Sequence, residues 1–206
     1  MPRPNMRLES GGAARPTGLF LLLFVCGPCL AEVRPRLAPV RDVTVDYTVQ
    51  PAGREAVEVR VEIEAGGQRL RITSADLPTT LLVNRATGVA AVLLPMLRAY
   101  SELNIARYDL ESGVLRGAVF SAAGRARVAG RDCTLWRARS PQGQANGCIT
   151  EDGVILEGDA TSGRRGQLGS VRATRVAYGV APGDGFEVPA GFQRSPIRLD
   201  AIGPMQ

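Results

Sequence analysis

Closely spaced carboxylates are the side chains of this sequence that could carry out acid–base chemistry. Glu58, Glu62 and Glu64 recur at even spacing, and two converging carboxylates are what a glycoside hydrolase uses. These glutamates alternate with apolar residues, which is typical of the solvent-facing side of a β-strand. We therefore predict a strand surface and no catalytic residue. A carboxylate-based hydrolase is the third hypothesis for function, and it requires two acids in one cleft.

The composition excludes several other chemistries. The 206 residues contain no His, and all 25 basic side chains are Arg because no Lys occurs. A His general base, a His metal ligand, a Schiff-base Lys and a P-loop Lys are therefore excluded. The acids at residues 150–153 lack the spacing of a calcium loop, and Gly163-Arg-Arg-Gly166 with Gly169 does not match a nucleotide-binding loop. We predict no metal site and no cofactor, and we interpret Tyr100 and Trp136 as core aromatics.

Nucleic acid is not a predicted partner. The net charge of the chain is +5, but basic residues are interspersed with acidic ones, as in Glu58-Val-Arg60-Val-Glu62. Nucleic-acid-binding proteins concentrate basic charge on one face. A mixed, solvated surface is the better interpretation.

Residues 1–31 have the pattern of a signal peptide. A start with three Arg is followed by a short apolar run at residues 18–25 and by small residues at Cys29-Leu-Ala31. We predict cleavage before Glu32 and a periplasmic protein with no permanent membrane anchor. The alternatives are a retained signal anchor, for which the apolar run falls short of about 18 residues, and a lipoprotein modified at Cys26, whose preceding residues are large.

After cleavage two cysteines remain, Cys133 and Cys148. An even pair in an exported protein predicts one disulfide. A hairpin of residues 133–138 and 143–148 with a four-residue loop at 139–142 would place the two cysteines opposite each other. Closing a loop of this size contributes about 3 kcal/mol in the chain-entropy model. A redox dithiol is less favoured because no Cys-x-x-Cys remains in the mature chain.

Period-two alternation predicts strands along most of the mature chain. After an extended leader at residues 32–41, the predicted strands lie at residues 43–49, 57–63, 70–72, 80–85, 89–94, 133–138, 143–150, 154–156 and 167–178. Asp152-Gly153 predicts a two-residue hairpin turn. Residues 102–112 are the predicted helix, since Leu103, Ala106 and Leu110 fall on one face. Residues 193–206 are predicted to be a loose tail.

Strands without strand–helix–strand repeats argue against a parallel sheet. A sandwich, a closed barrel and a strongly curved open sheet covered by a helix all remain compatible with the pattern. A curved sheet with one apolar face requires a cover, and a hydrophobic ligand could be part of it.

Several motifs resemble those of bacterial periplasmic proteins known as a domain family of unknown function. The motifs are Arg71-Ile-Thr-Ser, Leu82-Val-Asn-Arg85, Pro95-Met-Leu-Arg-Ala-Tyr100, Gly130-Arg-Asp-Cys133-Thr-Leu-Trp136, Gly147-Cys148-Ile-Thr-Glu-Asp-Gly153-Val-Ile-Leu156 and Phe186-Glu-Val-Pro-Ala-Gly-Phe192. The resemblance covers residues 42–192 and is to the LolA-like superfamily. It implies a mainly β fold: an open, strongly curved antiparallel half-barrel of about ten strands, with one short helix as a lid over an apolar cavity. It supplies no ligand-binding residue.

The leading hypothesis for function is a non-enzymatic periplasmic protein that binds or carries a lipid, an acyl chain or a lipoprotein segment. The apolar alternation and the export signal motivate it. The second hypothesis is a structural or protein-interaction module of the cell envelope, with an envelope protein as its partner.

Overall fold

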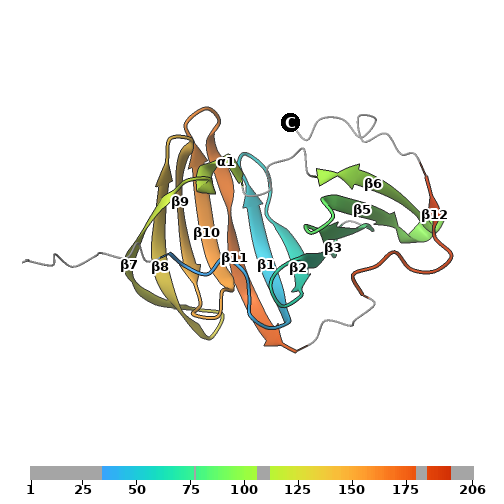
Figure 1. The fold of residues 1–206 in the computed structure, drawn as a ribbon, viewed down its shortest axis with the longest axis horizontal. Coiled ribbons are helices and arrows are strands. Elements are labelled where there is room, and N and C mark those ends of the chain that lie inside the picture. Colours follow the sequence, from blue (N-terminus) through green and yellow to red (C-terminus); the bar gives the residue numbers. More distant parts are fainter. Residues whose placement is uncertain (1–33, 77, 106–111, 180–184, 196–206) are drawn as a thin grey trace, which may run out of the picture. The chain divides into compact units, whose positions relative to one another are not determined.

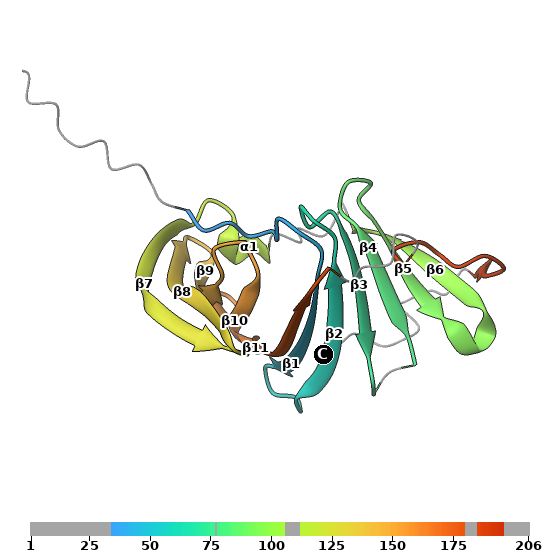
Figure 2. The ribbon, with the colours of Figure 1, turned by 90° about the horizontal axis from the view of Figure 1, so that it is seen from below.

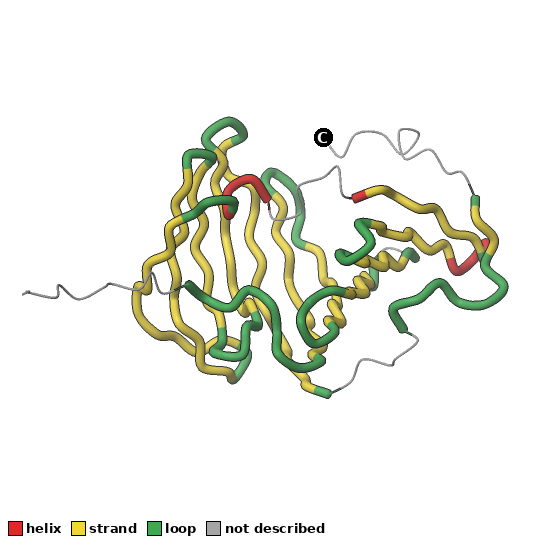
Figure 3. Tube along the Cα trace, viewed as in Figure 1, coloured by secondary structure: helices red, strands yellow, loops and turns green. Residues whose placement is uncertain are grey.

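The computed structural model describes residues 34–76, 78–105, 112–179 and 185–195. The chain divides into two units, Met1–Ala31 and Glu32–Gln206, and all described residues belong to the second. Most of their regular structure is strand, and the two helical segments are short (Figures 1 and 3). The strands are β1 Val43–Pro51, β2 Val57–Ile63, β3 Arg69–Ser74, β4 Thr80–Asn84, β5 Val89–Leu94, β6 Ala99–Asn104, β7 Val119–Val128, β8 Arg131–Ser140, β9 Gly143–Ile149, β10 Ile155–Ser162, β11 Gly166–Tyr178 and β12 Gln193–Arg194; the helical segments are the 3-10 turn η1 Pro95–Leu97 and the helix α1 Ser112–Leu115.

The twelve strands of the described residues form one open sheet. Its order is β12-β6-β5-β4-β3-β2-β1-β11-β10-β9-β8-β7, and all neighbours are antiparallel except β12, which runs parallel to β6. Consecutive hairpins build two blocks, β1 to β6 and β7 to β11, and the pairing of β1 with β11 joins them. Figure 2 shows the strands from β11 to β7 curling to one side. The predicted mainly β fold with an open antiparallel sheet is confirmed, with twelve strands instead of about ten.

The larger hydrophobic cluster follows the alternation of β1. Val43, Val45 and Tyr47 are buried, and they lie opposite apolar residues of β2 such as Val59 and Val61. The hydroxyl of Tyr47 donates a hydrogen bond to the carbonyl of Ile155 at 2.7 Å, which satisfies its polar atom inside the cluster. Burial raises the pKa of Tyr47, so this side chain stays neutral.

A smaller cluster lies on β4, β5 and β6. Leu82 lies opposite Ala91 and Leu93 opposite Tyr100, and Val188 and Phe192 pack against them. The amide of Gln193 then donates to the carbonyl of Arg98 at 2.8 Å, and β12 begins. Two residues of the segment predicted to be a tail therefore form an edge strand, and residues 196–206 lie outside the described residues.

The predicted helix over residues 102–112 is wrong in its first part, because residues 102–104 belong to β6. Leu103 lies opposite Ala90 in β5, so the apolar spacing that resembled a helix face belongs partly to a strand. Residues 106–111 lie outside the described residues, and the helix α1 begins at Ser112.

Strand β7 was not predicted, and a β-bulge explains why. Between Ala122 and Gly124 one extra residue enters the strand, so Ala122 lies opposite Trp136 while Gly124 lies opposite Leu135. A bulge shifts which residues share a face, and the period-two pattern is lost at that point.

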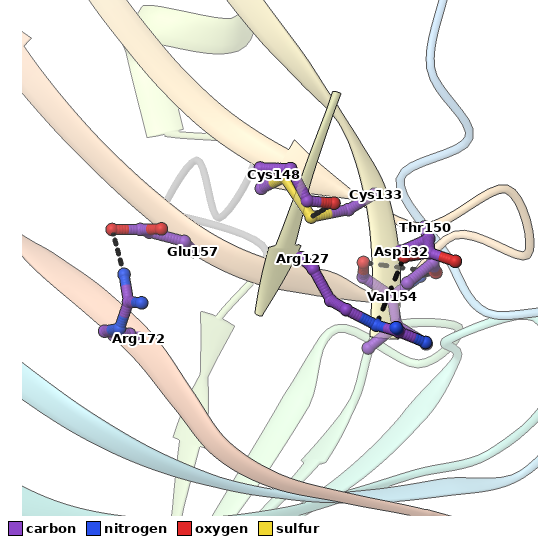
Figure 4. The surroundings of a disulfide bond; sticks show 9 residues. Arg127, Asp132, Cys133, Cys148, Thr150, Val154, Glu157 and Arg172 are labelled. Carbon is purple, nitrogen blue, oxygen red and sulfur yellow. Dashed lines mark hydrogen bonds and ion pairs between the residues drawn. A yellow bond between two sulfur atoms is a disulfide. The ribbon is translucent and has the colours of Figure 1, made fainter. Parts of the chain in front are cut away.

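Cys133 and Cys148 are joined by a disulfide, with 5.4 Å between their Cα atoms (Figure 4). The predicted hairpin register is wrong by two residues. Ser140 lies opposite Gly143, so the turn contains two residues instead of four, and Leu135 lies opposite Cys148. Cys133 is therefore a diagonal neighbour of Cys148, and its Cα atom is still within bridging distance.

The predicted two-residue turn at Asp152-Gly153 is also longer in the structure. The amide of Thr150 donates to the carbonyl of Val154 at 2.9 Å, so three residues connect the flanking pair. Gly153 has a φ of +92°, which favours glycine at the last position of such a loop.

The leader is held between two turns of the sheet. The amide of Val40 donates to the carbonyl of Asp152 at 3.1 Å, and the amide of Gly66 donates to the carbonyl of Pro39 at 2.7 Å. A Cβ atom on Gly153 would lie 2.2 Å from the carbonyl oxygen of Ala38. Glycine at position 153 is thus required twice, by its φ and by the close approach of the leader.

We expect Gly153→Ala to destabilise the protein more than Gly53→Ala. Both positions have positive φ, +92° and +70°, and an alanine costs about 1–2 kcal/mol in that region. A Cβ on Gly53 meets nothing within 4 Å, whereas one on Gly153 displaces Ala38. Urea denaturation measures the difference, and hydrogen exchange of the Val40 amide reports release of the leader. Equal losses for the two variants would show that the leader does not depend on Gly153.

Candidate hydrophobic binding site

An apolar pocket of about 380 Å³ lies against strands β7 to β11 and the end of β1. Trp136, Gly147, Gly158 and Val171 are successive partners across these strands, so they share one face of the sheet, which we call the inner face. Its lining includes Val49, Leu115, Phe120, Trp136, Ile149 and Val171. The volume lies within the range of about 300–1,000 Å³ that is usual for ligand pockets.

The pocket exists because its floor is built from small residues. The small-residue floor consists of Ala138, Ala145, Gly147, Gly158, Ala160 and Gly169, all of which line the pocket. Cross-strand register places Ala138 opposite Ala145, and Gly147 opposite Gly158. Strands usually favour β-branched and aromatic residues, whose side chains would fill this space.

Gly158 shows that the small size is not a backbone requirement. A Cβ atom at this position would make ordinary contacts with Val171 and Ile155, and the backbone is not in the left-handed region. Gly169 differs, because its φ is +130° and a Cβ would lie 2.6 Å from the carbonyl oxygen of Gln50. At Gly158 the missing side chain leaves space in the pocket.

The helix α1 and the leader complete the walls. Leu115 of α1 lines the pocket, and Val114 beside it is buried, which anchors the short helix against the sheet. α1 contacts β8, β9 and β10, in agreement with its place in Figures 1 and 2. Leu37 of the leader and Leu168 of β11 also line the pocket and are 41% and 39% exposed, so the wall carries apolar side chains that reach solvent.

A polar pocket of about 430 Å³ adjoins the apolar one. Its charged lining consists of Arg34, Arg36, Arg125, Asp132 and Glu151. Trp136 and Ile149 line both pockets, so the apolar and the polar space meet at these two side chains.

The glutamates of the sequence pattern do not form a site. Glu58 accepts a hydrogen bond from the hydroxyl of Thr48 at 2.5 Å, and Glu62 lies 3.5 Å from Arg71. Glu64 accepts hydrogen bonds from Arg69, which lower the pKa of that carboxyl. Each carboxylate has its own partner, as expected of a strand surface.

The other motifs also lack a chemical arrangement. Gly163 lies in the turn between β10 and β11, where its amide donates to the carbonyl of Gln142 at 2.9 Å, and Tyr100 packs in the smaller cluster. Trp136, interpreted from the sequence as a core aromatic, lines the pocket instead. Among the described residues no group of three or more acids or cysteines is placed to hold a metal ion. No helix in the described part of the chain is long and apolar enough to span a membrane.

Hydrogen bonds and a cation–π contact among Arg41, Asp152 and Tyr178 hold the leader beside the pocket. Asp152 accepts hydrogen bonds from Arg41 at 3.2 Å and from the hydroxyl of Tyr178 at 3.2 Å, and the Arg41 guanidinium lies 3.7 Å from the centre of the Tyr178 ring. Partial burial raises the pKa of Asp152, but hydrogen bonds from Thr150, Tyr178 and Arg41 outweigh it and hold that pKa below its usual value. The charged form of Asp152 is therefore the one that the fold stabilises.

The fold of this chain, one open antiparallel sheet, is shared by solved structures. No family model and no curated protein matches this sequence. An uncharacterized conserved protein from Thermus thermophilus matches with a TM-score of 0.53 and 10% identity, over 76% of this chain and 91% of that one. MucB in the Pseudomonas aeruginosa MucA/MucB complex matches with a TM-score of 0.51 and 16% identity, over 73% of this chain and 56% of MucB.

This chain therefore spans little more than half the length of MucB, and at these identities the likeness is one of fold. The open antiparallel fold that the sequence resemblance implied is confirmed. A LolA superfamily protein from Nitrosomonas europaea also matches, with a TM-score of 0.40 and 7% identity over 72% of this chain and 91% of that one.

We expect Asp152→Asn to destabilise the protein by about 1–3 kcal/mol at pH 7, because the variant loses a charge-assisted hydrogen-bond network. Because the pKa of Asp152 is lower in the folded state, this stabilisation is fully present above the ordinary value of 3.8 and is lost as pH falls through the folded-state pKa. Urea denaturation at pH 7 and near pH 3 should show a smaller gap between variant and wild type at the lower pH.

The same exchange at exposed Asp76 is the control for that measurement. A gap for Asp152→Asn that is equal at both pH values would contradict a stabilising role for the ionised carboxylate.

Proposed function

We propose that this protein is an exported, non-enzymatic binding protein that holds the hydrophobic chain of a lipid, an acyl chain or a lipoprotein segment in the apolar pocket. The small-residue floor is the observation that carries the proposal. Protein interiors are closely packed, so a hollow of about 380 Å³ with apolar walls is a place for an occupant.

The energetics of such an occupant are adequate. Each buried methylene contributes about 0.8 kcal/mol, so a chain with about ten methylenes in the pocket contributes about 8 kcal/mol before the costs of association. Association costs of about 4 kcal/mol or more leave a millimolar or weaker affinity for the chain alone, since 1 mM corresponds to about 4.1 kcal/mol. A binder of this strength can also release its ligand.

Export is part of the proposal. Residues 1–31 serve as the signal peptide, residues 32–41 as the leader, residues 42–192 as the LolA-like domain and residues 193–206 as the C-terminal segment. The disulfide of Cys133 and Cys148 supports an oxidising compartment such as the periplasm.

We expect Gly158→Leu to weaken binding of a hydrophobic chain at least about tenfold, because the leucine occupies space that about two methylenes would fill. Trp136 is the single tryptophan and lines the pocket. Its fluorescence should be quenched by a terminally brominated dodecanol in the wild-type protein and much less in the variant.

Ala177→Leu is the matched control, since Ala177 also lies in β11 but pairs with Thr44 and does not line the pocket. Circular dichroism and disulfide content establish that both variants fold. Absence of quenching in the wild-type protein, or equal quenching in Gly158→Leu, would overturn the proposed function.

A second candidate function is a protein-interaction module of the envelope. Met96 and Leu97 of η1 are 86% and 72% exposed, an unusual exposure for two adjacent large apolar residues. MucB, which shares the fold, has been solved in complex with MucA. The exposed pair supports a protein partner at this turn, and the MucA/MucB complex supports a protein partner for this fold without locating its site.

A photo-crosslinking residue at Leu97 tests this second function in intact cells. We expect one discrete crosslinked product if the turn docks on a partner, and none from the same residue placed at Arg85 in the exposed β4–β5 turn. The absence of any product at position 97 would leave the exposed pair without a partner and contradict this second function.

A further inference from the structure

The polar pocket adjoins the apolar one and shares two of its lining residues. Trp136 and Ile149 line both spaces, and Thr134, which lies opposite Ile149 on the same face, lines the polar one. A molecule that fills the apolar pocket and extends past Trp136 therefore enters a space with charged walls.

The bulge in β7 places Arg125 on this face. Phe120 and Ala122 lie opposite Ala138 and Trp136 on the inner face, and simple alternation would turn position 125 to the other side. Because of the bulge between Ala122 and Gly124, Arg125 lies opposite Thr134 and shares the inner face. Bulges frequently re-aim a side chain next to a functional site.

The leader supplies the second cation. Arg36 lines the polar pocket, and the next residue, Leu37, lines the apolar one. One short segment thus contributes a guanidinium to one space and an aliphatic side chain to the other. The hydrogen bonds of Pro39 and Val40 with neighbouring turns hold this segment in place.

Positive charge predominates in the polar pocket. Arg34, Arg36 and Arg125 face two acids, Asp132 and Glu151. Asp132 already has a partner, since its carboxylate lies 3.3 Å from Arg127. A guanidinium binds carboxylate and phosphate oxygens through paired donors, so the excess favours an anionic group.

We propose that the ligand is a single-chain amphiphile with an anionic head, whose chain occupies the apolar pocket and whose carboxylate or phosphate is bound by Arg36 and Arg125. This inference rests on the proposed function and names its ligand class. The carboxylate of a free fatty acid and the phosphate of an alkyl phosphate share the required chemistry.

Four probes with the same chain length test the inference on the mature, oxidised protein: dodecanoate, dodecyl phosphate, dodecanol and dodecyltrimethylammonium. Each competes with a neutral naphthylamine dye, and Trp136 fluorescence is a second readout. We expect at least one anionic probe to bind about tenfold more tightly than dodecanol, and the cationic probe to bind most weakly. The preference should shrink with added salt.

Arg36→Gln and Arg125→Gln should each reduce affinity for the preferred anion several-fold, with a smaller effect on dodecanol. Arg137→Gln is the matched control, because Arg137 follows Trp136 in β8 and does not line either pocket. Arg125→Lys keeps the charge and should retain part of the preference. Far-ultraviolet circular dichroism establishes that each variant is folded.

The outcomes separate the two proposals. Tighter binding of dodecanoate or of dodecyl phosphate supports the inference and identifies the head group. Two results would contradict binding of an anionic head group without contradicting binding of the hydrophobic chain. One is equal affinity for dodecanol and both anions. The other is a preference for the anion that persists in the double variant Arg36→Gln/Arg125→Gln. Failure of all four probes to bind overturns the proposed function itself.

Discussion

Close packing is the constraint from which the rest of this structure is understood. On the inner face of β8 to β11 the side chains are too small to fill the curve of the sheet, and the space stays open. A Cβ atom added at Gly158, which lines that space, would make only ordinary van der Waals contacts. Larger apolar side chains, including Phe120 and Val171, form the walls of the pocket. The pocket is open because the residues of its floor have small side chains or none.

A floor of this kind is costly for the sheet. A glycine within a strand costs about 0.5–1 kcal/mol relative to alanine, and a hollow loses the dispersion contacts of its lining. Other parts of the fold offset the cost. The disulfide crosslinks β8 to β9, the long pairing of β1 with β11 joins the two hairpin blocks, and the Arg41–Asp152 contact fixes the leader. These supports lie around the pocket and leave its interior free.

Part of this fold can be predicted from the sequence. Regular alternation in β1 and β2 predicts both strands and their buried face, because the register there is undisturbed. The other elements could not be predicted correctly, because the local structure is irregular there. The bulge conceals β7, a two-residue turn shifts the β8–β9 register from the expected one, and helix-like spacing obscures β6. Gly147, Gly158 and Gly169 are visible as strand interruptions, but only the register shows that they line one pocket.

The β-bulge that interrupts the period-two pattern of β7 also determines that a charged side chain lies beside the pocket. A strand that alternated without interruption would place Arg125 on the face opposite Ala122, away from Trp136. The extra residue reverses that assignment and leaves a cation at the boundary where the apolar lining ends. A substitution alters one side chain at a time, whereas a bulge changes the face of every residue beyond it. The polarity of this boundary is thus a property of the backbone register as much as of the residue at position 125.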